Sequence, residues 1–154
     1  MSTVALLRSA GPDAGRLIRF LAGVHRVAVV DASDGDRAVA ALRRIGPATV
    51  VAAGGDAPVA LDAAVAVPEA VDQLVLFEPQ PVGDWPDRYR EVRVPVLTVV
   101  GSGRPPERTR GAYVVATLCP AAMLIRLDLV GDDLFVTDPL TVGRTVLGLL
   151  PGNR

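Results

Sequence analysis

Residues 49–79 read TVVAAGGDAPVALDAAVAVPEAVDQLVLFEP, and this stretch decides the fold. An apolar, β-branched run ends at a Gly-Gly turn, and a second run of valine and leucine ends at Phe77. Between them, residues 57–67 are apolar almost all round, which is typical of a deeply buried helix. The order strand, helix, strand predicts two parallel strands joined by a helical crossover.

The same alternation recurs along the rest of the chain. Short apolar runs that favour strands alternate with stretches of helical spacing, such as Leu17, Leu21 and Val24. This pattern predicts one three-layer α/β domain, a parallel sheet with helices on both faces. The predicted strands are Val4–Leu7, Arg26–Asp31, Ala48–Ala53, Gln73–Phe77, Val96–Val100 and Met123–Leu129.

Length and charge exclude several classes of protein. The 154 residues suffice for a single domain, residues 1–154, but not for two. Hydrophobic residues make up 50% of the chain, yet no purely apolar run of about 18 residues occurs, so we expect no membrane span. The net charge of −1 provides no basic surface for nucleic acid.

Cysteine and histidine are scarce. The single cysteine, Cys119, excludes an internal disulfide and suits a reducing cytosol, and the first residues do not resemble a secretion signal. We therefore expect a cytoplasmic protein. No cluster of histidine and cysteine indicates a metal site, and we expect no cofactor. The absence of lysine, with many Ala, Val, Gly and Pro residues, indicates GC-rich coding, as in an actinobacterium.

Residues 49–79 resemble the α/β-hydrolase family. In that family a strand, a G-x-S-x-G nucleophile elbow and a helix are followed by P-E-x-V and an L-V-L strand. The elbow aligns with Ala52-Ala53-Gly54-Gly55-Asp56, so a glycine stands in the nucleophile position. The family's nucleophile usually has a positive φ, which glycine adopts without strain. The resemblance implies that the elbow persists without its nucleophile.

Further segments extend the resemblance over most of the chain. Residues 6–11 look like the family's first conserved strand and its His-Gly oxyanion loop, with Ser9 in the place of the histidine. Residues 25–31 are similar to the next strand, and residues 94–101 to the penultimate one. Asp138-Pro139 matches the start of the last helix.

The remaining triad positions are altered as well. Where the family places its acid, two or three residues after Gly101, this chain has Gly103 and Arg104. Gly131-Asp132 stands where the family has Gly-His. The resemblance therefore implies a protein without the Ser-His-Asp triad.

The resemblance also implies the topology. The sheet is expected in the order 2-1-3-4-5-6, numbered by this chain, with right-handed crossovers. The family's lid would fall within residues 80–92, which have room for one short helix. A site with almost no lid is either shallow or completed by a partner.

Gly54, Gly55 and Asp56 are the first candidate site residues. Two glycines at a helix N-terminus could bind an anion or a carbonyl group through backbone N–H groups, and Asp56 could act as a catalytic carboxylate. The alternative is a tight turn in which Asp56 caps the helix.

Asp132 and Glu78 are the other candidate catalytic residues. A carboxylate in an apolar pocket can have a raised pKa and act as an acid or a base. The structural alternatives are a solvated loop aspartate for Asp132 and an ordinary Glu-Pro turn for Glu78.

Ser9, Ala10 and Ser102 are predicted to contact a ligand, because they follow strands one and five, at the edge where open α/β sheets bind ligands. The one histidine, His25, precedes strand two at the opposite edge and is expected to be structural. Without a histidine at the ligand edge, a Ser-His-Asp mechanism has no base.

Three functions remain open. The protein could bind a small, largely apolar molecule and catalyse a non-hydrolytic step with pocket carboxylates, such as cyclisation, isomerisation or elimination. It could be a catalytically silent pseudoenzyme that acts as a scaffold or partner subunit. It could also be a hydrolase with a relocated nucleophile.

The sequence further predicts a homodimer. Strand Arg26–Asp31 forms an edge without proline or a central charge, and the near-absence of a lid is expected to leave Phe77, Pro79 and Trp85 partly uncovered. The two protomers would either pair this edge strand across a two-fold axis or cover each other's site with residues 81–92.

Overall fold

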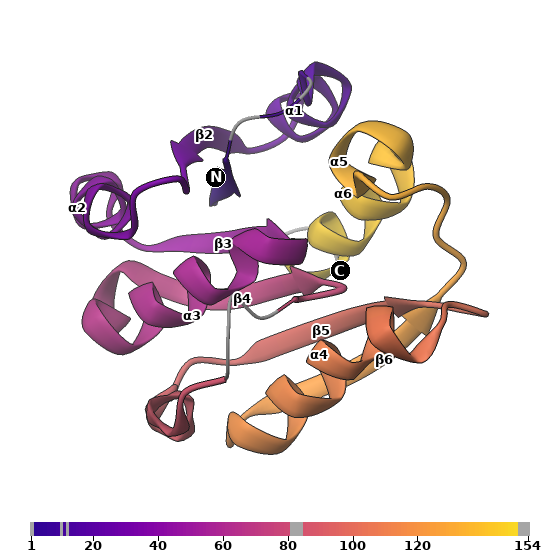
Figure 1. Ribbon diagram of the computed structural model, residues 1–154. Coiled ribbons are helices and arrows are strands. Elements are labelled where there is room, and N and C mark those ends of the chain that lie inside the picture. Colours follow the sequence, from indigo (N-terminus) through magenta and orange to yellow (C-terminus); the bar gives the residue numbers. More distant parts are fainter. Residues whose placement is uncertain (1, 10, 12, 81–84, 151–154) are drawn as a thin grey trace.

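The six apolar runs form one parallel sheet in the computed structural model, which describes residues 2–9, 11, 13–80 and 85–150. The strand order is β2-β1-β3-β4-β5-β6 and every neighbouring pair is parallel, so the predicted fold class and topology are confirmed (Figure 1). The strands are β1 (Thr3–Arg8), β2 (Arg26–Asp31), β3 (Ala48–Ala53), β4 (Val71–Phe77), β5 (Val96–Gly101) and β6 (Ala122–Leu127).

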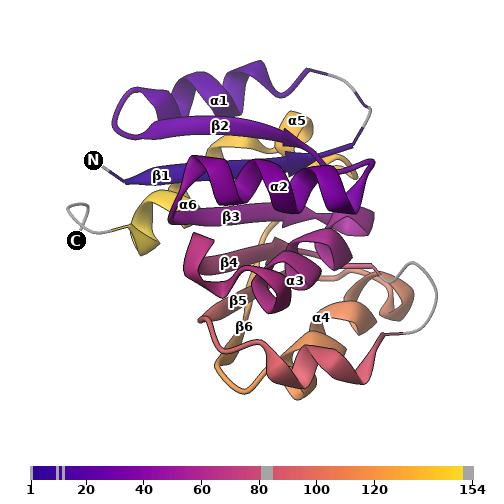
Figure 2. The same cartoon turned by 90° about the vertical axis from the view of Figure 1, so that its left-hand side faces the viewer.

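Helices cover both faces of the sheet, so the domain has three layers (Figure 2). One face packs against α2 (Gly35–Ile45), α3 (Ala57–Ala66) and α4 (Pro106–Leu118). The other packs against α1 (Gly15–Ala22), α5 (Leu134–Thr137) and α6 (Pro139–Leu149). The described part of the chain also contains the 3₁₀ turns η1 (Gly54–Asp56), η2 (Pro68–Ala70) and η3 (Asp87–Glu91). Among the described residues, no helix has the length and apolar character needed to cross a membrane.

The strands are continuous apolar runs because helices cover both faces of the sheet. Successive side chains of a strand point to opposite faces, so a central strand buries every residue. Val50 and Val51 on β3 are both fully buried, yet they belong to the cores on opposite faces of the sheet. The small side chains of α3, including Ala60 and Ala64, are buried against the sheet, as the all-round apolar pattern predicts.

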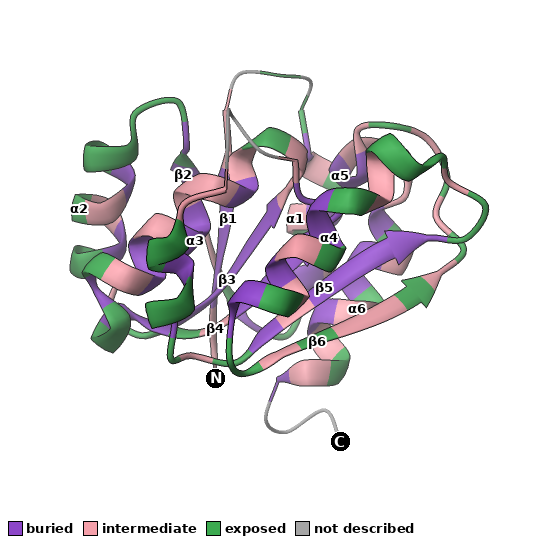
Figure 3. Ribbon diagram, turned by 60° about the horizontal axis from the view of Figure 1, so that its bottom comes forward, coloured by how far each residue is buried: buried purple, intermediate pink, exposed green. Residues whose placement is uncertain are grey.

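The pairing of β6 with β5 explains why the sequence misplaced the end of β6. Figure 3 shows β5 largely buried and β6 intermediate or exposed, as expected of an edge strand. The last pair between these strands joins Gly101 to Leu127. Because β5 ends there, the predicted extension of β6 to Leu129 has no partner and is wrong.

The described residues that follow β4 are better covered than expected. Phe77 and Pro79 are buried, so the prediction that they stay partly uncovered is wrong. Phe77 belongs to the core that contains α5 and α6, and the backbone of Pro79 abuts Gly111 of α4. Trp85 is half-buried against Tyr89 of η3, with ring centroids 5.9 Å apart.

Strand β2 is the other edge of the sheet. It pairs with β1 alone, and its Val29 side chain is 53% exposed. The homodimer remains a prediction, and residues 81–84 of the segment suggested to cover a partner lie outside the described residues.

We predict that Gly111→Ala lowers the free energy of unfolding. Alanine favours helices, but a Cβ at this position would overlap the backbone carbonyl of Pro79, which cannot move like a flexible side chain. We expect a loss of about 1–3 kcal/mol in urea unfolding. Gly148→Ala on α6 is the matched control, because no atom lies within 4 Å of its added Cβ. It should raise stability by about 0.5–1 kcal/mol, and equal effects of the two variants would contradict the packing described.

Candidate functional site

The elbow predicted from the sequence is present as a backbone conformation. Gly54 directly follows β3 and has φ +57°, in the left-handed region that favours glycine. The chain then turns through η1 into α3. No atom lies within 4 Å of a Cβ built on Gly54, so the position opens into free space. The turn is therefore shaped to present a side chain but has none.

A cleft of about 340 Å³ lies over Gly54. Its walls come from the ends of β3 and β4, the start of α4 and the loop before α5. This is the carboxyl edge of the central strands, where open α/β sheets place ligands. The apolar lining comprises Ala53, Phe77, Pro105 and Leu134, and the polar lining comprises Glu78, Gln80, Glu107, Arg108 and Asp132.

A smaller and more polar cavity of about 210 Å³ adjoins the cleft. The two share Ala53, Gly54, Asp132 and Leu134, so they form one continuous depression around the elbow. The smaller cavity adds Arg8, Ser9, Asp56, Asp133 and Phe135 to the lining. The loops after β1, β3 and β6 thus converge at the same point.

Glu78 anchors the cleft wall. Its side chain is 3% exposed, and its Oε1 accepts a hydrogen bond of 2.9 Å from Nε of Arg108. Its Oε2 accepts from the backbone N–H of Gly101 at 3.3 Å. Nε of Arg104 also lies 3.3 Å from Oε2, as an ion pair without hydrogen-bond alignment. Glu78 has φ +46°, a strained conformation for a residue with a side chain, which the surrounding contacts enforce.

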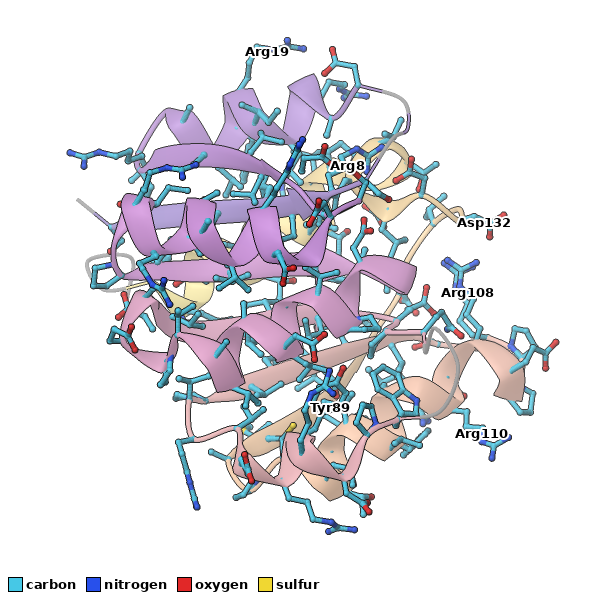
Figure 4. All side chains as sticks on the ribbon, turned by 60° about the vertical axis from the view of Figure 1, so that its left-hand side comes forward. Arg8, Arg19, Tyr89, Arg108, Arg110 and Asp132 are labelled. Carbon is cyan, nitrogen blue, oxygen red and sulfur yellow. The ribbon has the colours of Figure 1, made fainter. Side chains whose placement is uncertain are left out.

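The two arginines connect this carboxylate to the loop before α5. Nη2 of Arg104 donates to the Gly131 carbonyl at 2.6 Å. Nη2 of Arg108 donates to the carbonyls of Gly131 and Asp132, at 3.2 and 3.1 Å. Nη1 of Arg108 pairs with the carboxylate of Asp132, and Figure 4 shows these two side chains directed toward each other at the cleft.

Asp56 connects the first and third loops. Its Oδ2 accepts a hydrogen bond of 3.1 Å from the backbone N–H of Ser9. Asp56 occupies the N-cap position of α3, as the alternative interpretation held, but its side chain makes no capping hydrogen bond to the helix. The N–H of Ser9 belongs to the loop that resembles an oxyanion loop, and here a carboxylate occupies it.

Arg8 and Asp133 hold the outer side of the smaller cavity. The guanidinium donates to both carboxylate oxygens, at 3.0 and 2.8 Å, and lies 5.8 Å from the centre of the Phe135 ring. The hydrogen bond to Asp133 raises the pKa of Arg8, while burial acts in the opposite direction.

The structure brings most of the predicted site residues together. Gly54, Glu78 and Asp132 line the cleft, and Ser9 and Asp56 line the adjoining cavity. Their roles as catalytic or ligand-binding residues remain predictions.

Other predicted residues lie elsewhere. Gly55 lines a separate cavity between α2, α3 and η3. Ser102 is exposed after β5, its backbone N–H donates to Leu127, and it is absent from the cavity linings described here. Ala10 lies outside the described residues. His25 is buried before β2, at the opposite edge of the sheet, as expected.

Sequence reasoning missed the role of Arg108. Arg104 precedes α4 and Arg108 lies in its first turn, so no helical spacing in the sequence indicated that both side chains would reach Glu78. Gln80 was missed as well, and its side chain donates to the Arg108 carbonyl at 2.9 Å. Among the described residues, no cluster of His, Cys, Asp and Glu could hold a metal ion.

We predict that Glu78→Gln destabilises the protein by about 2–4 kcal/mol in urea unfolding, because two partly buried guanidinium groups lose their shared carboxylate. Asp62→Asn is the matched control, since it breaks the pair of Asp62 with Arg88, in which both side chains are at least 40% exposed. The control should change stability by less than about 1 kcal/mol. A loss for Glu78→Gln no larger than that of the control would show that the buried pair does not support the fold.

Comparison with known proteins supports the fold. No protein-family model matches the chain, and no curated protein matches its sequence. A serine hydrolase involved in carbazole degradation superposes with a TM-score of 0.75 and 16% identity, over 96% of this chain and 90% of its own.

Two other solved structures agree. Naproxen esterase from Bacillus subtilis has a TM-score of 0.73 and 12% identity, over 96% of this chain and 82% of its own. An alpha/beta hydrolase from Sphaerobacter thermophilus has a TM-score of 0.69 and 15% identity, over 94% of this chain and 91% of its own. At such identities the similarity establishes the α/β-hydrolase fold alone.

Proposed function

We propose that the protein binds a small, largely apolar molecule in the cleft over Gly54 and does not hydrolyse it. The observation that carries this proposal is the open, left-handed Gly54 beneath a 340 Å³ cleft with apolar walls. That volume lies within the range of small-molecule sites, at the lower end.

The absence of a histidine near the elbow supports the lack of hydrolysis. The chain has one histidine, His25, and it is buried at the far edge of the sheet. Ser9 and Ser102 follow strands on the correct edge but lack an imidazole to remove a proton from their hydroxyl groups. The relocated-nucleophile function is therefore the least supported of the three.

The candidate catalytic carboxylates Glu78, Asp132 and Asp56 differ in whether an arginine is paired with them. Glu78 and Asp132 are both engaged by arginine. Asp56 forms no ion pair within the described part of the chain and accepts one backbone hydrogen bond. If the bound molecule undergoes proton transfer, Asp56 is the residue that we propose as the acid or base.

The ion pairs also favour a second candidate function. A site whose carboxylates are held by Arg104 and Arg108 suits a catalytically silent pseudoenzyme that acts as a scaffold or partner subunit. A binding measurement distinguishes the two functions. Binding of a small molecule in the cleft favours the first function, because a scaffold does not need a ligand there.

We predict no turnover of p-nitrophenyl acetate above a heat-treated control, measured by absorbance at neutral pH. Gly54→Ser should also be inactive, because the added hydroxyl has no histidine to activate it. Turnover that disappears in Ser9→Ala or Ser102→Ala would contradict the prediction and support a relocated nucleophile.

We predict that the protein binds the neutral, apolar fluorophore N-phenyl-1-naphthylamine and that Gly54→Asn weakens this binding about tenfold. Asparagine tolerates positive φ, and its amide would project a polar group into the cleft. Gly103→Asn is the matched control, with φ +71° and an equally open Cβ position, but outside the described cavity linings. Equal affinities of both variants, or no binding by the unmodified protein, would contradict the site.

A further inference from the structure

The buried part of the ion network is not balanced in charge. Glu78 contributes one negative charge, while Arg104 and Arg108 contribute two positive charges, and these side chains are 3%, 17% and 21% exposed. Two positive charges and one negative charge leave one positive charge in excess at the base of the cleft. A partly buried excess charge requires a nearby counterion, because water solvates it incompletely.

Asp132 supplies this counterion from the solvent side. Its carboxylate pairs with Nη1 of Arg108, but the Asp132 side chain is 92% exposed. An ion pair with so exposed a partner contributes little to stability, and the carboxylate can return to water without loss of solvation. The guanidinium itself stays in place, because Glu78 and the Gly131 carbonyl hold its Nε and Nη2.

The position held by Asp132 adjoins apolar walls. Arg108 and Asp132 line the same cleft as Phe77, Pro105 and Leu134. A ligand that carries a carboxylate on an apolar body could pair with Arg108 and bury its body in the cleft at the same time. Asp132 can provide the first of these interactions but not the second.

We propose that the ligand of the cleft is an apolar monocarboxylic acid, whose carboxylate replaces that of Asp132 on Arg108. This inference rests on the proposed binding function and adds the chemical class of the ligand. Arg108 is the residue that determines specificity, and Glu78 is the residue that positions it, by accepting a hydrogen bond from its Nε.

The rest of the lining limits the charge of the ligand to one. Glu107 lies on the rim of the cleft and is exposed, and Asp56 and Asp133 line the adjoining cavity. Asp133 is already paired with Arg8. A second negative charge on the ligand would face these carboxylates without a further guanidinium, so dicarboxylic acids are expected to bind poorly.

The test compares 1-naphthylacetic acid with 1-naphthylacetamide by calorimetry at neutral pH. The two probes have the same apolar body and differ by one negative charge. We expect the acid to bind about tenfold tighter than the amide, because a carboxylate pairs with guanidinium more strongly than an amide does. Arg108→Gln should remove this preference, with folding verified by circular dichroism.

Asp132→Asn provides an independent variant that should fold, because the replaced side chain is exposed. It should strengthen binding of the acid about two- to fivefold and leave binding of the amide unchanged, since the competing carboxylate is removed. Asp128→Asn is the matched control, with the same loss of charge on an exposed side chain outside the described cavity linings, and should alter neither affinity.

The outcomes separate the two proposals. Equal affinities for acid and amide would overturn the ligand class while leaving the binding function intact. Weaker binding of the acid by Asp132→Asn would also overturn the ligand class, because Asp132 would then assist the ligand and not compete with it. Failure of both probes to bind would overturn the binding function and the ligand class together.

Discussion

A carboxylate buried between two guanidinium groups holds the carboxyl edge of this sheet in place. Glu78 stands at the end of β4 in a left-handed conformation and accepts hydrogen bonds from Arg108 and from the backbone of Gly101. Through Arg104 and Arg108 the same carboxylate fixes the Gly131 carbonyl. Three loops that are distant in sequence thereby form one wall of the cleft, and the strain at Glu78 persists because several contacts enforce it.

The turn at Gly54 and the ion pairs around Glu78 can be understood together. In a hydrolase fold, the loops around the elbow position an acid and a base for a nucleophile. In this chain the turn after β3 has a left-handed backbone at Gly54, and the resemblance seen in the sequence implies an arginine in the region of the acid and an aspartate in the position of the histidine. The converging loops therefore carry complementary charges that neutralise one another.

The sequence predicted the fold well because the fold depends on local patterns. The all-round apolar residues of α3 and the β-branched run of β3 indicate their own structure, and six such alternations specify a parallel sheet. Strand ends were less predictable, since the end of β6 at Leu127 is set by the length of its neighbour β5. That length is a property of the pairing and not of residues 128–129.

The candidate site could be predicted in position but not in its contacts. Gly54, Glu78 and Asp132 follow strands of one sheet and so must meet at one edge. The pairing of Arg108 with Glu78 joins residues separated by 30 positions, and it depends on how α4 packs against the end of β4. Likewise, Asp56 after β3 accepts a hydrogen bond from Ser9 after the neighbouring strand β1, whereas its position before α3 suggested a capping bond. No local sequence pattern encodes either contact.

The most direct measurement is a titration of ¹⁵N-labelled protein with the ester 1-naphthyl acetate, followed by two-dimensional NMR. If the cleft binds without hydrolysis, saturable shifts will appear at the amides of Gly54, Glu78 and Leu134, and the resonances of the ester will stay intact throughout. Shifts confined to the edge of the sheet near His25, or release of 1-naphthol faster than in buffer, would contradict the account.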